Sequence, residues 1–371
     1  MKLTCAPSVW GGLELERSLD RMTITIKQEA HVVAATRKHI PELVETGKVP
    51  ARIPCGAKLR ALLDSLTLIQ GTGPLTKAQK QVQSIVGELR WLCRTHVRIT
   101  KPVHMLSCVA ARASEGALDA ALGTLAQVYI DRHRGLTFGG TTATSEDMIT
   151  GALKGTVSRN ATIHRVDGEA KMERGPPATL EGASDATWSL SNEQSGKCVD
   201  VYAMALTLNG AAVMLQLKRI GLYTGSSAMA EGLALLKLSD CAVHAAMVVE
   251  RMGGTAPEGG VLLLCDAESA LRTAAGEASV ARLKHGLRRS SIVTQRVKEH
   301  EVRLAHLPDA VHFIDPLTKW VKLEKAERAF RYLAGEVARA IHDPTFGTVN
   351  APHTATVMAV LTAWLEDARM I

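Results

Sequence analysis

Four acidic residues stand out because each lies where a solvated surface charge is not expected. Asp185 lies in the strand-like stretch LEGASDATWSL, and Glu231 heads the apolar stripe of a long predicted helix. Asp266 ends the apolar run VLLLC, and Asp315 follows the short segment VHFI. A carboxylate placed this way costs free energy unless something compensates it, and a metal ion is the usual compensation. The four residues therefore predict a divalent-metal site.

The chemistry that such a site performs is hydrolysis of a phosphodiester. Carboxylates that converge on one end of a sheet repel one another, and two divalent cations remove this repulsion. Two metals about 4 Å apart stabilise both the attacking water and the leaving 3′-oxygen. No nucleophilic side chain is then required, and the sequence contains no GxSxG motif, no Walker A loop and no GxGxxG after a strand.

Each carboxylate also has an ordinary structural interpretation. Glu231 could be an exposed glutamate that interacts with the dipole at a helix N-terminus. Asp266 could cap the helix that begins AESALRTAA, and Asp185 could be a half-exposed strand aspartate. Asp315 precedes Pro316 and could be a helix cap. Ligand sites in α/β sheets gather at the carboxyl ends of strands, which favours the metal site at Asp266.

The strands and helices that would position these residues follow one another in the order βββαβαβα. This order predicts an α/β domain with a mixed sheet. The predicted strands and the long helix cover 180–188, 199–208, 211–219, about 227–252, 261–266 and around 301–307. The long helix carries one face at positions 231, 235, 238, 242, 245, 249 and 252. Only Glu231 is charged on this face, so its carboxylate is expected to pack on the sheet.

The sequence before residue 141 has the pattern of a separate, mainly helical region. It contains a strand at 22–28, a helix-like stretch at 31–47, a loop at 61–76 and helices at about 77–97, 102–113 and 115–133. On the last of these, Leu118, Leu122, Leu125, Ala126 and Ile130 form the expected buried face. Residues 141–178 are polar and rich in Gly and Thr, and predict a linker or a long hairpin.

Composition sets broad limits on function. The chain has 371 residues with 46% apolar and 22% charged residues, as expected for a globular protein of two or three domains. A net charge of +7 is compatible with a polyanionic partner, but many proteins without a nucleic-acid role carry such a surplus. Aromatic residues are scarce at 4%, which argues against single-strand binding by base stacking.

Cysteine usage and hydropathy predict a soluble intracellular protein, in the cytoplasm or the nucleus. The seven cysteines are odd in number and widely spaced, and no CxxC occurs. This pattern fits a reducing compartment and excludes the common zinc motifs. The first twenty residues contain no secretory signal, and no segment approaches the roughly 18–20 uninterrupted apolar residues of a membrane span.

Several motifs resemble the Ty1/copia class of retrotransposon polyproteins over roughly residues 9–332. EGASDATW is similar to the family's G.SDADW strand, SSAMAEGLAL to SS.TEAEY.AL, LLLCDAESA to.L.CDNQSA, and IDPLTK to ADIFTK. Upstream, QSIVGELRWLCRTHVRITKPVHMLS resembles the end of the family's reverse transcriptase. The resemblance implies the end of a reverse transcriptase followed by a ribonuclease H domain.

The resemblance implies a five-stranded mixed sheet with Asp185 on its first strand. Carried over by position, Asp185, Glu231, Asp266 and Asp315 match the family's metal-binding carboxylates. They would hold two Mg²⁺ ions, with Mn²⁺ as a possible substitute, and cleave the RNA strand of an RNA–DNA hybrid. The implied segments are a palm remnant (1–75), a thumb or connection (76–140), the linker or hairpin (141–178), the ribonuclease H-like domain (179–335) and a helical tail (336–371).

Departures from the family pattern keep a second interpretation open. AEY has become AEG at Gly232, and CDN has become CDA at Ala267. No YVDD-type strand occurs in the sequence, so polymerase activity is not expected. The alternative to an active ribonuclease H is an inactive Pol remnant that binds nucleic acid or serves only as an interaction module.

Basic residues predict contacts to the phosphates of nucleic acid. The candidates are Lys218, Arg219, Arg282, Lys284, Arg288 and Arg289. Their ordinary alternative is a solvated helix face or strand end. Recognition of a hybrid is expected to rest on shape, phosphates and 2′-hydroxyl groups. His306 and His312 precede Asp315 and could assist proton transfer, although histidines without such a role are common.

Overall fold

The computed structural model divides the chain into two compact units, each with its own core. One unit is Met1–Glu16 with Thr25–Leu136, and the other is Arg17–Ile24 with Thr137–Ile371. The described residues are 9–17, 23–139, 180–188, 200–220, 226–251, 256–257, 259–276, 287–307, 309 and 312–336. The predicted linker or hairpin (141–178) and all but the first residue of the predicted tail (336–371) lie outside the described residues.

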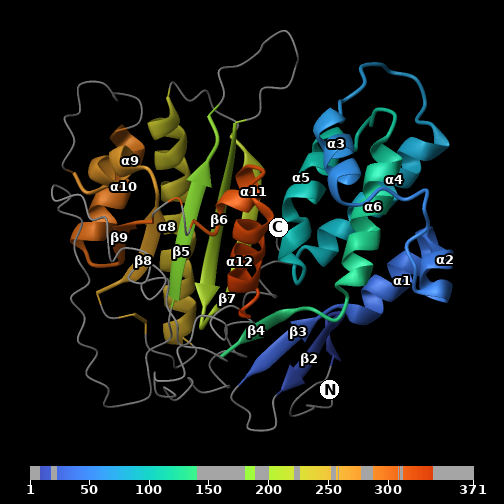
Figure 1. The fold of residues 1–371 in the computed structure, drawn as a ribbon. Helices are drawn as coiled ribbons and strands as arrows, with labels where there is room; N and C mark the ends of the chain where they lie inside the picture. The colour runs from blue at the N-terminus through green and yellow to red at the C-terminus, as the bar shows by residue number, and fades with distance from the viewer. Residues whose placement is uncertain are drawn as a thin grey trace. The chain divides into compact units, whose positions relative to one another are not determined.

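A small sheet and several helices make up the first part of the chain (Figure 1). The sheet has the order β1-β2-β3-β4, with β1 Val9–Trp10, β2 Leu13–Arg17, β3 Ile24–Lys27 and β4 Leu136–Phe138. The helices are α1 Glu29–His39, α2 Pro41–Thr46, α3 Gly56–Ser65, α4 Lys77–Leu92, η1 Val97–Ile99, α5 Thr100–Val109 and α6 Ala117–Ile130. The predicted strand at 22–28 is confirmed by β3.

Four details of this helical region differ from the sequence predictions. The helix predicted at about 77–97 ends at Leu92. The stretch predicted as one helix at 31–47 breaks at Ile40, because Pro41 restricts the residue before it and begins α2. Residues 61–65 were expected in a loop but belong to α3, where Leu59 and Leu63 at i, i+4 spacing give the helix a buried face. Ile130, predicted to be buried, is 51% exposed at the end of α6.

The second unit contains a five-stranded mixed sheet, as predicted. Its strands are β5 Leu180–Ala186, β6 Val201–Leu208, β7 Ala211–Arg219, β8 Val261–Cys265 and β9 Val302–His306, in the order β7-β6-β5-β8-β9. The pairs β5–β6 and β6–β7 are antiparallel, whereas β5–β8 and β8–β9 are parallel. Asp185 lies on the first strand of this sheet, so the expected placement is confirmed.

Local sequence explains why these strands pair as they do. Asn209 and Gly210 join β6 to β7 with positive φ angles of 49° and 90°, as a tight hairpin turn requires. All five residues of β8 are buried, as expected for a strand covered on both faces. On β5, a Cβ atom at Gly182 would lie 2.7 Å from Leu238 Cδ1 and 2.9 Å from the Ala205 carbonyl oxygen. Glycine at this position therefore permits a helix to pack closely on the central strand.

That helix is α8 (Ser227–Arg251), which packs on β5, β6 and β8. The predicted face is buried at Glu231, Leu235, Leu238, Ala242 and Val249. By length and composition alone α8 could cross a membrane, unlike any other helix in the described part of the chain. The same test is passed by core helices such as this one, whose apolar face lies against a sheet.

The described residues of the second unit form four further helices: α9 Glu268–Ala274, α10 Leu287–Lys298, α11 Asp315–Thr318 and α12 Leu323–Leu333. The helices α9 and α10 pack on α8, whereas α11 contacts β5 and β6 and α12 contacts β7. Alternate residues of a strand face opposite sides, so Glu181 and Asp185 share one side of β5 while Gly182 faces α8. The side chains of Thr318 and Tyr332 bond to Asp185 and Glu181, which places α11 and α12 on their side of the sheet.

Candidate metal centre

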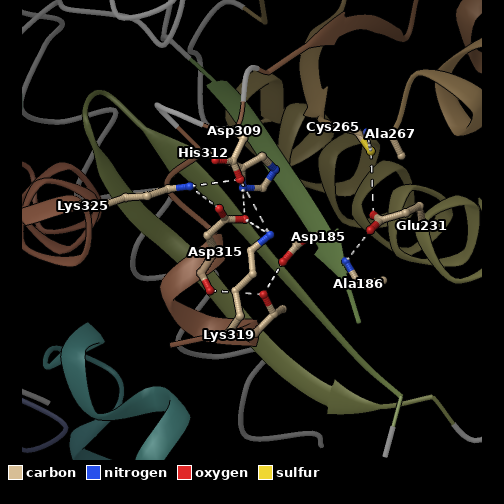
Figure 2. Close-up of polar contacts among 11 residues, drawn as sticks. Asp185, Ala186, Glu231, Cys265, Ala267, Asp309, His312, Asp315, Lys319 and Lys325 are labelled. Atoms are coloured by element: carbon tan, nitrogen blue, oxygen red, sulfur yellow. Dashed lines mark hydrogen bonds and ion pairs between the residues drawn. The ribbon is translucent and has the colours of Figure 1, made fainter. Parts of the chain in front are cut away.

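The four predicted carboxylates come together at one edge of the sheet in the second unit. Asp185 lies near the end of β5, and Asp266 directly follows β8, which runs parallel to β5. Because the carboxyl ends of parallel strands meet at the same edge, the two aspartates converge. Glu231 comes from the first turns of α8, and Asp315 begins α11 (Figure 2).

Two overlapping groups of ligand atoms result from this arrangement. Asp185, Asp266, His312 and Asp315 each place one ligand atom within 4.8 Å of the others. Glu231, Cys265 and Asp266 form a second group under the same limit. Asp266 belongs to both groups, so it lies between the two positions.

The burial of these carboxylates excludes their ordinary structural interpretations. Asp185 is 2% exposed, Glu231 6% and Asp315 0%, so none is a half-exposed or frayed surface residue. Asp266 is of intermediate exposure. The N-cap of α9 is Ala267 and that of α11 is Ile314, so neither aspartate caps its helix.

Asp185 is held on the sheet by a neighbour from α11. Thr318 Oγ1 donates a hydrogen bond to Asp185 Oδ2 and also contacts the backbone oxygen of Asp315 at 3.2 Å. The pKa of Asp185 is raised above its usual value, chiefly by burial and further by the nearby charge of Asp315. Thr318 fixes the orientation of Asp185, but burial still disfavours its charged form.

Glu231 bridges α8 and the ends of two strands. Its Oε1 accepts a hydrogen bond from the Ala186 backbone N–H at 3.0 Å, and the Cys265 thiol donates to its Oε2 at 3.8 Å. Burial and the charge of Asp185 raise the pKa of Glu231 to about 9. Burial and the charge of Glu231 also raise the pKa of Cys265 well above its usual value, so Cys265 remains a thiol donor at neutral pH.

Asp315 has two lysine partners that the sequence analysis did not identify. Lys319 Nζ lies 3.0 Å from Asp315 Oδ1, and Lys325 Nζ contacts Asp315 Oδ2 (Figure 2). Lys325 Nζ also lies 3.3 Å from Asp309 Oδ1. Lys319 stands four residues after Asp315, a spacing that brings side chains together on a helix and could have revealed the pair. Lys325 comes from α12, and no sequence signal connects it to Asp315.

The two predicted histidines have different surroundings. His306 Nε2 lies 3.1 Å from the backbone oxygen of Asp266 and so supports the segment that carries this aspartate. His312 is fully buried, and its Nδ1 lies 3.2 Å from Asp315 Oδ1. Among the described residues, neither ring nitrogen of His312 makes a hydrogen bond, and neither does Asp315 Oδ1.

The residues of this centre fit a divalent cation. The pKa values of Asp185 and Glu231 stay raised because the nearby charge of Lys319 does not offset their burial, and a divalent ion would supply further positive charge. Asp315 Oδ1 is buried and makes no hydrogen bond that meets the usual geometry, although Lys319 Nζ lies 3.0 Å from it, and such an ion would share this oxygen with the lysine. Carboxylate oxygens are the ligands that Mg²⁺ and Mn²⁺ favour.

The predicted contacts to nucleic acid are placed only in part. Lys218 and Arg219 are exposed at the end of β7, an outer strand of the sheet. The other predicted contacts are Arg282, Lys284, Arg288 and Arg289. The first two lie outside the described residues, and the last two belong to α10 with side chains outside the described part. The nearby Arg296 instead bonds to Ser239 Oγ and Asp240 Oδ1, both at 2.7 Å, and joins α10 to α8.

Known structures with weak similarity to this chain include ribonuclease H domains. LC11-RNase H1 in complex with an RNA/DNA hybrid is 16% identical, with a TM-score of 0.26, over 35% of this chain and 86% of that chain. The N-terminal ribonuclease H domain of a Mycobacterium tuberculosis protein, solved as a maltose-binding-protein fusion, is 15% identical, with a TM-score of 0.27, over 41% and 94%. The prototype foamy virus protease–reverse transcriptase is 18% identical, with a TM-score of 0.24, over 45% and 21%.

No family model matches the chain, and no curated protein matches it. The TM-scores of these structures are too low to support an assignment of the fold. The assignment of the fold rests instead on the strand order and strand directions of the five-stranded sheet.

Proposed function

We propose that this chain is a metal-dependent ribonuclease H that cleaves the RNA strand of an RNA–DNA hybrid. The observation that carries the proposal is the convergence of Asp185, Glu231, Asp266 and Asp315 at the edge of a five-stranded mixed sheet. All four were selected by position in the sequence motifs, and they come from four separate elements or their ends. A purely structural role does not require carboxylates from four elements to gather in two adjoining groups of ligand atoms.

Each side chain has a defined part in this proposal. Asp185 and Asp266 would contact both divalent ions or the attacking water, and Glu231 and Asp315 would complete the two coordination shells. When bound, the ions would polarise the phosphate and lower the pKa of the attacking water. Thr318 holds the orientation of Asp185, and the Ala186 N–H holds that of Glu231. This preformed geometry reduces the reorganisation needed when substrate binds.

The partner in this proposal is an RNA–DNA hybrid contacted through its phosphates. Lys218 and Arg219 are exposed and available for such contacts. The proposed origin is a Ty1/copia-type Pol polyprotein, which assigns 179–335 to the ribonuclease H domain and 76–140 to a thumb or connection. The helices α4, α5 and α6 pack together in the latter region and are compatible with that assignment.

A second candidate is an inactive remnant that at most binds nucleic acid. It is favoured by Lys319 and Lys325, whose ammonium groups both contact Asp315 and neutralise it without a metal. Gly232 and Ala267 replace larger family residues beside Glu231 and Asp266. A Cβ atom at Gly232 would meet nothing within 4 Å. The space that the larger family residue would fill is therefore open in this chain.

Cleavage of a labelled hybrid distinguishes the two candidates. The purified protein is incubated with the hybrid in Mg²⁺ and in Mn²⁺, beside an Asp185→Asn variant. Cleavage of the RNA strand by the wild type but not by the variant supports the enzyme. A folded wild type that cleaves in neither metal, but binds hybrid in a salt-dependent manner, supports the remnant.

A further inference from the structure

His312 is a buried histidine whose ring nitrogens have no hydrogen-bond partner among the described residues. Its side chain is fully buried, and the nearest charged group is Asp315, whose Oδ1 lies 3.2 Å from His312 Nδ1. That contact does not form a hydrogen bond, since both atoms remain without one. Burial of unpaired nitrogens is unfavourable unless another partner is present. The environment of His312 is therefore incomplete without a further group.

A nitrogen of His312 lies where such a group would bind. It is within 4.8 Å of one carboxylate oxygen from each of Asp185, Asp266 and Asp315, which are themselves mutually within this limit. In Figure 2 the imidazole of His312 lies beside the carboxylate of Asp315. One nitrogen and three oxygens thus surround a single small volume.

We propose that His312 is a nitrogen ligand to a divalent ion that Asp185, Asp266 and Asp315 also hold. The proposal rests on the metal centre of the proposed function and adds a ligand to the four carboxylates. Imidazole suits first-row transition-metal ions such as Fe²⁺, Ni²⁺ and Zn²⁺, whereas Mg²⁺ favours oxygen ligands and retained waters. A nitrogen ligand would therefore favour a transition-metal ion over Mg²⁺ at this position, and Mn²⁺ is the paramagnetic ion that reports such a ligand.

A simple ion pair with Asp315 explains the position of His312 less well. Asp315 already has two cationic partners, Lys319 and Lys325, and does not need a third. The backbone that carries His312 is also held in place, because the next two residues, Phe313 and Ile314, are buried in the core. The Phe313 ring contacts the Tyr332 ring with centroids 4.5 Å apart. A ligand that is held in place before the ion arrives is the arrangement that metal sites require.

Pulsed electron paramagnetic resonance of bound Mn²⁺ tests this directly. The wild-type protein with one equivalent of Mn²⁺ should show spin-echo modulation from a nitrogen nucleus. Labelling of histidine alone with ¹⁵N should change the modulation frequency, and a wild-type spectrum without histidine nitrogen overturns the proposal. This measurement requires no variant and no substrate.

A His312→Gln variant identifies the residue. The nitrogen modulation should disappear in His312→Gln but persist in His244→Gln, which changes an exposed histidine on α8. Calorimetric titration should show Mn²⁺ affinity reduced about 10- to 100-fold in His312→Gln, with a much smaller change for Mg²⁺. Modulation that persists in a folded His312→Gln overturns the proposal, and His312→Asn replaces this variant if it does not fold.

Failure of this inference is distinguishable from failure of the proposed function. Hybrid cleavage in Mg²⁺ without nitrogen coupling in Mn²⁺ refutes the role of His312 and leaves the ribonuclease H proposal intact. Histidine nitrogen coupling without cleavage under any metal confirms the ligand and refutes the enzyme. A protein that binds no divalent ion refutes both.

Discussion

At the scale of single residues, Asp185 and Glu231 are buried carboxylates whose burial outweighs the nearby positive charge. The pKa of Glu231 is raised from 4.5 to about 9, and that of Asp185 is raised as well, both mainly by burial. A carboxylate with a raised folded-state pKa binds its proton more tightly when folded. Its contribution to stability is complete below pH 4.5 and is lost as the pH rises towards about 9.

We therefore predict that the metal-free protein loses stability as the pH rises, whereas divalent metal restores it. Thermal unfolding between about pH 5 and pH 8.5 should show a falling midpoint in EDTA, and a metal-induced increase that grows with pH. Glu231→Gln is the matched control, because it keeps an oxygen acceptor for the Ala186 N–H and cannot ionise. Its metal-free midpoint should vary less with pH, and a metal-free wild type that becomes more stable over this range contradicts the prediction.

Lys325 is predicted to compete with metal at Asp315. Its ammonium contacts Asp315 and Asp309, so Lys325→Met should lower the metal-free unfolding midpoint and raise metal affinity. The gain should reach about tenfold, which corresponds to about 1.4 kcal/mol. Calorimetric titration with Mn²⁺ measures the affinity, and Lys322→Met at an exposed position nearby is the control. Unchanged affinity in Lys325→Met would show that Lys325 and the ion do not share Asp315.

At the scale of elements, α12 supports the face of the sheet that carries the candidate centre. Besides Lys325, it contributes Tyr332, whose hydroxyl donates to the buried carboxylate of Glu181 on β5. Tyr332→Phe should cost about 1–3 kcal/mol, because the buried Glu181 carboxylate loses the hydroxyl donor while the contact of the ring with Phe313 remains. Denaturant unfolding measures the loss. A double-mutant cycle with Glu181→Gln should show coupling, and additive effects would exclude a direct interaction.

The sequence predicted the elements that have strong local patterns. The β-strands β5 to β9 and the helix α8 were expected from alternation, from the buried run VLLLC and from the apolar stripe that begins at Glu231. The convergence of Asp185 with Asp266 also followed from strand ends. Residues 61–65 were misassigned because α3 is short and its buried face has only Leu59 and Leu63. The helix predicted at 77–97 ends at Leu92, and only tertiary contacts decide where such a helix stops.

The parts of the centre that the sequence did not reveal depend on tertiary structure. Lys325 reaches Asp315 only because α12 turns back after α11, and no periodic spacing connects the two residues. The complete burial of His312 could not be inferred either, since histidine occurs both in cores and on surfaces. Thr318 was part of the motif IDPLTK, but its hydrogen bond to Asp185 becomes visible only when α11 lies on β5.

At the scale of the whole molecule, the net charge of +7 bears on how a hybrid would be bound. Each phosphate contact by Lys or Arg adds to the slope of log affinity against log salt. Replacement of both Lys218 and Arg219 by alanine should reduce this slope by roughly 1 to 2 without a change in metal affinity. Fluorescence anisotropy with a labelled hybrid at several salt concentrations measures the slope. An unchanged slope would place the nucleic acid away from the end of β7.

The close approach of α8 to the central strand has a consequence for gene copies related to this one. Gly182 has no side chain, and a Cβ atom there would lie 2.7 Å from Leu238 Cδ1 and 2.9 Å from the Ala205 carbonyl oxygen, so the backbone of β6 would have to shift together with the Leu238 side chain of α8, the helix that carries Glu231. One nucleotide change from glycine to alanine would then disturb the candidate centre while every acidic codon stayed intact. A comparison of genes that counts only carboxylates would class such a copy as intact, although one added methyl group distinguishes the two.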